Sequence, residues 1–69
     1  MKTETEKLIN AAQEVERYLL ALRERLEARN RNVEDSKDFQ YNKAKLHGLL
    51  VAFECFNLDQ SEFSWIYYY

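Results

Sequence analysis

The sequence predicts an all-α protein, an antiparallel helical hairpin followed by a short aromatic C-terminal helix or tail. Apolar residues recur at intervals of three and four over residues 4–30 and again over 34–58, the pattern of helices that pack along a heptad seam. The 69 residues include no proline and one glycine, and 46 % are hydrophobic, which is not a disordered composition. A chain of this length forms one domain, here residues 1–69.

The first helix is expected over about residues 4–30. Thr3, followed three residues later by Glu6, fits a capping box at its start. The helix carries its seam at spacings of 4, 3, 4, 3 and 4, namely Leu8, Ala12, Val15, Leu19, Leu22 and Leu26. This regular spacing predicts a single apolar stripe along the helix.

The second helix is expected over about residues 34–58. Asn30 and Asn32 mark the connection, because asparagine tolerates left-handed backbone and caps helices well. So short a connection implies that the two helices are antiparallel. The second seam consists of Phe39, Asn42, Leu46, Leu49, Phe53 and Phe56.

The segment 46–58 is apolar on nearly all sides, and one antiparallel neighbour covers only one of its faces. A dimeric four-helix bundle would cover the remainder, so a homodimer or higher homo-oligomer is expected. Gly48 is expected to let another helix approach closely. The predicted oligomer interface consists of Leu46, Gly48, Leu49, Leu50, Ala52, Phe53 and Phe56.

The C-terminal segment 60–69 is unusually aromatic. Asp59 and Glu62 fit a capping box, which favours a short helix from Gln60. An extended tail is the alternative, and alternation would then place Phe63, Trp65, Tyr67 and Tyr69 on one face. The segment either folds back over the hairpin or docks on a partner, since Trp and Tyr dominate interface energetics. The predicted partner-binding residues are Trp65, Tyr67, Tyr68 and Tyr69.

The charges are unevenly distributed within a net charge of −2. Residues 23–45 carry seven basic and five acidic side chains, whereas residues 46–69 carry three acidic and no basic ones. Antiparallel pairing of two copies would bring these regions together, which favours orientation more than stability. The basic turn end also offers an alternative function, RNA binding by a helical-hairpin dimer. Its interleaved acidic side chains argue against such nucleic-acid binding. The basic side chains concerned are Arg23, Arg25, Arg29, Arg31, Lys37, Lys43 and Lys45.

No catalytic, cofactor or metal motif is recognisable, and the chain has one histidine and one cysteine, His47 and Cys55. The longest apolar run, Leu49 to Phe53, is far shorter than the roughly 20 residues needed to span a bilayer. No membrane association is expected, and the N-terminal residues lack the apolar core of a signal peptide. We therefore expect a cytoplasmic, non-enzymatic protein–protein interaction module. Such a module is a small regulator or adaptor that acts as a homo-oligomer and binds a protein partner.

Overall fold

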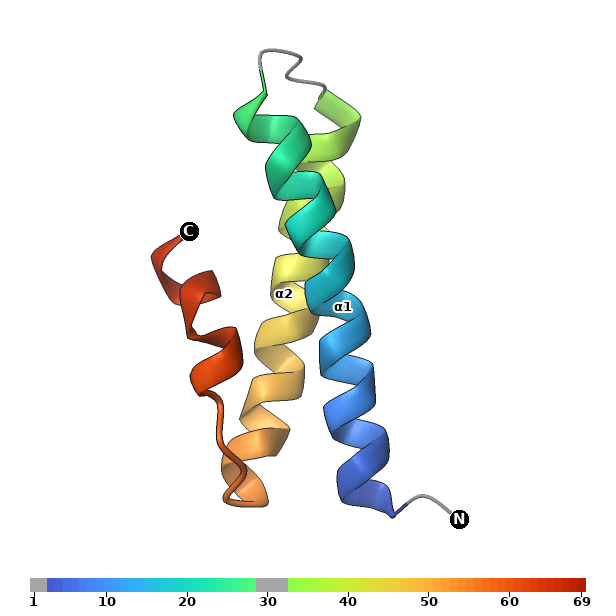
Figure 1. Ribbon diagram of the computed structural model, residues 1–69, viewed down its shortest axis with the longest axis vertical. Helices are drawn as coiled ribbons and strands as arrows, with labels where there is room; N and C mark the ends of the chain where they lie inside the picture. Colours follow the sequence, from blue (N-terminus) through green and yellow to red (C-terminus); the bar gives the residue numbers. More distant parts are fainter. Residues whose placement is uncertain (1–2, 29–32) are drawn as a thin grey trace.

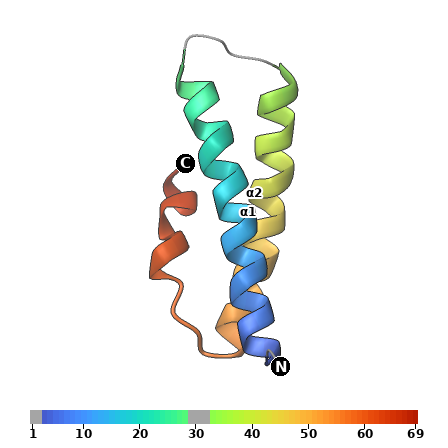
Figure 2. The same cartoon turned by 45° about the vertical axis from the view of Figure 1, so that its right-hand side comes forward.

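A computed structural model describes residues 3–28 and 33–69, which form three helical elements. Helix α1 spans Glu4–Glu27, α2 spans Val33–Cys55, and the 3-10 helix η1 spans Ser61–Tyr68. Figures 1 and 2 show α1 and α2 as an antiparallel hairpin, with η1 running back along it in the direction of α1. The predicted all-helical hairpin is confirmed.

Helix α1 begins where the sequence places its cap. The side-chain Oγ1 of Thr3 accepts a hydrogen bond of 3.1 Å from the backbone N–H of Glu6, which satisfies one of the free donors at the helix start. The helix ends at Glu27, because Ala28 turns to extended backbone (φ −68°, ψ 162°). This end precedes the predicted one near residue 30. The predicted Asn30 to Asn32 connection lies outside the described residues.

Helix α2 ends in a Schellman motif, three residues before the predicted end at residue 58. The backbone N–H of Leu58 donates to the carbonyl of Phe53 (2.8 Å), and that of Asn57 donates to Glu54 (3.1 Å). Asn57 has a φ of 55°, and asparagine enters this left-handed region more readily than most residues. The chain therefore reverses here and leads directly into η1.

The hairpin core follows the predicted seam of α1 closely and that of α2 only in part. Leu50, which the predicted seam omitted, is 1 % exposed, and Leu49 is half-buried. The seam prediction is wrong at Phe56, whose side chain is 58 % exposed just past the end of α2. The buried apolar side chains of the two helices are Ala12, Val15, Leu19, Leu22, Phe39, Leu46, Leu50 and Phe53.

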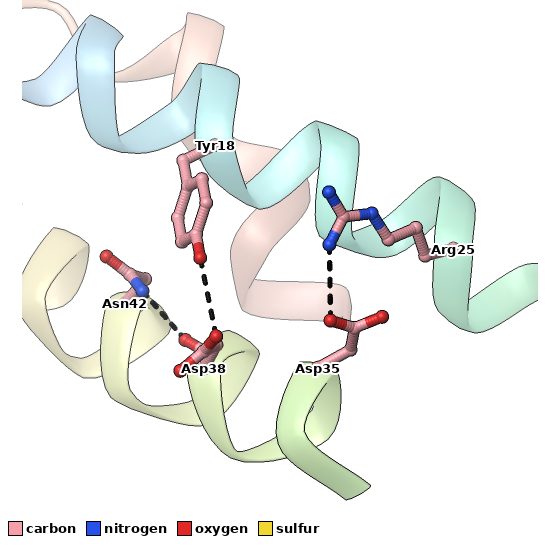
Figure 3. A network of polar contacts seen from close by, with 5 residues as sticks. All are labelled: Tyr18, Arg25, Asp35, Asp38 and Asn42. Atoms are coloured by element: carbon pink, nitrogen blue, oxygen red, sulfur yellow. Dashed lines mark hydrogen bonds and ion pairs between the residues drawn. The ribbon is translucent and has the colours of Figure 1, made fainter. Parts of the chain in front are cut away.

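Polar side chains join α1 and α2 near the turn end of the hairpin (Figure 3). Arg25 Nη1 lies 3.2 Å from Oδ1 of Asp35, and the hydroxyl of Tyr18 donates to Oδ2 of Asp38 at 3.4 Å. Asn42, predicted as a polar member of the seam, instead donates from Nδ2 to the carbonyl of Asp38 in its own helix. These exposed contacts favour alignment of the helices and add modestly to stability.

The aromatic segment is helical, so the alternative of an extended tail is wrong. In a 3-10 helix, residues three apart lie directly above one another. Phe63, Ile66 and Tyr69 therefore share one face of η1, and Phe63 and Ile66 are fully buried. The ring of Phe63 meets that of Phe53 edge-on at 5.4 Å. The C-terminal segment thus completes the core that the hairpin leaves open.

Asp59 fixes the start of η1. Its Oδ1 accepts a hydrogen bond from the backbone N–H of Ser61 (3.0 Å), and its Oδ2 accepts one from the Ser61 hydroxyl (2.9 Å). These two bonds, the backbone one foremost, lower the pKa of Asp59 below its ordinary value of 3.8. The predicted capping box between Asp59 and Glu62 is wrong: Gln60 is the N-cap of η1 without a side-chain cap hydrogen bond, and Asp59 instead closes a local turn onto Ser61. Among the described residues, no helix is long and apolar enough to cross a membrane.

Candidate protein-interaction surfaces

Trp65 fastens η1 to α1. Its indole Nε1 donates a hydrogen bond of 2.9 Å to Oε2 of Glu16, which is only 8 % exposed. The guanidinium of Arg23 lies 4.8 Å from the centre of the Trp65 ring and 5.7 Å from that of Tyr69. Both distances are within the range of cation–π attraction. Trp65, predicted to bind a partner, therefore makes its contacts with α1 of the same chain.

Tyr69 bridges the two long helices. Its hydroxyl donates to Oε1 of Glu27 on α1 at 3.0 Å, and its ring centre lies 5.1 Å from that of Phe39 on α2. An aromatic pair at this distance adds about 0.5–1.5 kcal/mol to the free energy of area burial. The second predicted partner-binding residue is thus also packed on the hairpin.

The side chains of Tyr67 and Tyr68 are more exposed than those of Trp65 and Tyr69. The ring of Tyr67 covers His47 at a centre-to-centre distance of 5.1 Å, and its hydroxyl donates to Oε1 of Gln60 at 3.2 Å. Nε2 of His47 is buried beneath it, with no hydrogen-bond partner in the described part of the chain. Tyr68 is 90 % exposed. Of the four residues predicted to bind a partner, Tyr68 is the most available and Tyr67 is partly available.

The predicted oligomer-interface residues are divided between the core and the surface. Leu46, Leu50 and Phe53 are buried within the single chain, while Leu49 and Ala52 are half-buried. Phe56 and Gly48 are exposed. The surplus apolar surface of the hairpin, which the sequence suggested a second copy would cover, is thus in large part covered by η1.

A row of exposed residues that sequence reasoning did not assemble runs along α2 opposite its buried side. We call it the outer α2 face and define it as Tyr41, Ala44, Gly48, Val51 and Cys55, all exposed. Their spacings of 3, 4, 3 and 4 form a second heptad stripe. Spacing alone did not reveal this stripe, because Leu46, Leu49 and Phe53 form a stronger one in the same helix.

The basic turn end is partly engaged within the chain. Arg23 packs over two rings of η1, and Arg25 pairs with Asp35. Arg29 and Arg31 lie outside the described residues. Among the basic residues that the structure describes, Arg23 and Arg25 thus contact other parts of the same chain.

Among residues 3–28 and 33–69, no three His, Cys, Asp or Glu side chains gather as a metal site. Comparisons of the chain with protein families, with curated proteins and with solved structures found no significant match.

Proposed function

We propose that this protein is a non-enzymatic interaction module, a small regulator or adaptor that acts as a homo-oligomer and binds a protein partner. The observation that carries the proposal is the apolar surface that stays exposed after η1 has covered the hairpin. Tyr41, Val51 and Tyr68 are 72 %, 60 % and 90 % exposed. Tyr41 and Val51 share the outer α2 face, and apolar side chains that share a face mark interaction sites more strongly than scattered ones do.

The exposed side chains lie on two different elements, which suits two different contacts. Tyr41 and Val51 lie on α2, while Tyr67 and Tyr68 lie on η1. Tyrosine supplies a large, rigid contact area and a hydroxyl that can hydrogen-bond at an interface. We assign the exposed tyrosines of η1 to the protein partner and α2 to self-association.

The composition of the chain supports the non-enzymatic part of the proposal. His47 is the only histidine, and Nε2 of its ring is buried beneath Tyr67, where a substrate would not reach it. We include a cytoplasmic location, because a single cysteine does not supply the paired cysteines typical of small secreted domains.

The partner contact is tested by affinity capture from a nuclease-treated lysate at moderate salt. The wild-type chain should retain a discrete protein, and Tyr68→Ala should lose it. Tyr18→Ala, which removes an exposed tyrosine from α1, is the matched control and should retain it. Failure of the wild type to retain any protein, or equal retention by Tyr68→Ala, would contradict the assigned contact. A protein that is captured from an untreated lysate but not from the nuclease-treated one would favour the nucleic-acid alternative instead.

A further inference from the structure

We propose that the outer α2 face binds the same face of a second copy of this chain, antiparallel, about a two-fold axis at Gly48. This inference rests on the proposed function, which includes self-association, and names the surface and its geometry. In such an isologous contact, a residue a given distance before Gly48 meets the residue the same distance after it in the other copy.

Gly48 itself has no packing reason within the single chain. A Cβ atom built on it would meet nothing within 4 Å, and its backbone is ordinary helix. Glycine in a helix interior destabilises the helix relative to alanine. A second helix crossing at this point would use the missing side chain, since small residues allow interaxial distances near the lower end of 8–10 Å.

The outer α2 face is self-complementary in size. Tyr41 lies seven residues before Gly48 and Cys55 lies seven after it, so the two-fold pairs a large side chain with a small one. Ala44 and Val51 lie four before and three after, and they pair in the same way. Two identical helices thus fit large against small along a stripe that spans about 21 Å at 1.5 Å per residue.

Charge selects the antiparallel orientation. Lys43 and Glu54 are eleven residues apart, about three turns, and so lie on the same side of α2. The antiparallel two-fold brings Lys43 of one copy alongside Glu54 of the other. In a parallel pair Lys43 of one copy would lie about three turns along the helix axis from Glu54 of the other, so the two would not pair. Lys37 likewise comes to the end of the second copy where residues 46–69 carry three acidic and no basic side chains.

Sedimentation velocity tests the face. The wild type should sediment at twice the chain mass of 8.4 kDa. Gly48→Lys, which sets two like charges across the axis, should sediment as a monomer with unchanged helicity. Ala21→Lys places the same side chain at an exposed alanine on α1 and should remain a dimer. Because nothing lies near Gly48 within the chain, the variant leaves the fold of the monomer intact.

Disulfide trapping tests the orientation. Cys55 is the only cysteine and is exposed. A Tyr41→Cys variant should form a covalent dimer on mild oxidation, and peptide mapping should join the introduced thiol to Cys55 of the other copy. Disulfides form only when Cα atoms lie within about 7 Å, so the bond reports register. A wild type that instead crosslinks efficiently through Cys55 alone would be parallel, which would overturn the inference.

The outcomes separate this inference from the function on which it rests. An oligomer that survives Gly48→Lys would overturn the assigned face and leave self-association standing. A wild type that sediments as a monomer would overturn both self-association and the face. If such a monomer loses its captured protein on Gly48→Lys, the face belongs to a foreign partner and the inference is again overturned.

Discussion

The indole of Trp65 and the carboxylate of Glu16 form a 2.9 Å hydrogen bond between residues 49 positions apart in the sequence. This contact ties the last element of the chain to the first, and Glu16 is nearly buried where it is made. A buried carboxylate is tolerated only when it is hydrogen-bonded. The pair therefore determines how firmly η1 is held to α1.

Removing either partner of this pair should destabilise the fold. Glu16→Ala leaves the indole N–H without its acceptor and should lower the free energy of unfolding by about 1–3 kcal/mol. Glu16→Gln keeps an acceptor oxygen and should cost less. Urea denaturation followed by far-UV circular dichroism measures both. Combining each variant with Trp65→Phe gives the coupling energy, and additive effects would show that the hydrogen bond contributes nothing.

Adjacent residues on α2 should respond in opposite ways. Leu50 is fully buried, so Leu50→Ala should cost about 2–5 kcal/mol, a large share of the roughly 3–10 kcal/mol expected for a chain of this length. Val51 is exposed, and in the monomeric Gly48→Lys background Val51→Ala should change stability by less than about 0.5 kcal/mol. Thermal unfolding by circular dichroism checks both, and similar losses would contradict the burial pattern.

Within η1, Ile66 and Tyr68 distinguish core packing from partner contact. Ile66→Ala removes a buried side chain and should lower stability by about 2–5 kcal/mol. Tyr68→Ala should leave the unfolding midpoint nearly unchanged while abolishing partner capture. If Tyr68→Ala unfolds the chain, the assignment of Tyr68 to a partner contact fails.

Asn57 should tolerate glycine better than alanine. At a φ of 55° a Cβ-bearing residue other than asparagine is strained, so Asn57→Ala should cost about 1–2 kcal/mol. Asn57→Gly should match or exceed the wild-type stability, because glycine is preferred where helices end in this motif. Comparison of urea midpoints measures the difference, and equal destabilisation by both substitutions would contradict the reversal described at Leu58.

The turn that Asp59 closes onto Ser61 should make the stability of η1 dependent on pH. Because folding lowers the pKa of this carboxyl, its contribution is complete above the ordinary value of 3.8 and is lost as the pH falls through the lowered pKa. The gap in melting temperature between wild type and Asp59→Asn should therefore narrow on acidification from about pH 6 to pH 2. Glu62→Gln removes a different carboxyl at the start of η1 and serves as the control. A gap in melting temperature between wild type and Asp59→Asn that stays constant with pH would contradict the role of Asp59.

Periodicity and capping predicted the hairpin because both are local properties of the chain. The start of α1 at Thr3 and most of its seam follow from spacing alone. The choice between Leu50 and Phe56 on α2 did not, because a helix apolar on nearly all sides has no unique buried face. Phe56 lies past the Schellman motif that ends α2, and Phe63 of η1 packs on Phe53, and the periodicity of α2 predicts neither.

The candidate surfaces were predicted less well for the same reason. Trp65 and Tyr69 are aromatic in the manner of interface residues, yet Glu16 and Glu27 on α1 hold them within the fold. Their acceptors lie more than forty residues away. Tyr68 differs from its neighbours only in its position around a three-residue turn. The residue types indicated the C-terminal segment as a contact site, and the geometry of η1 determines that Tyr68 is the residue left most exposed.

The position of η1 also bears on how the protein is made. Ribosomes release the N-terminal residues first, so α1 and α2 emerge before the segment whose Phe63 packs on Phe53. Until Phe63 and Ile66 are synthesised, the apolar side chains that they cover in the folded protein stay exposed to solvent. Synthesis that stalls within residues 59–69 would therefore yield a fragment with exposed apolar side chains, which chaperones would bind and proteases would degrade.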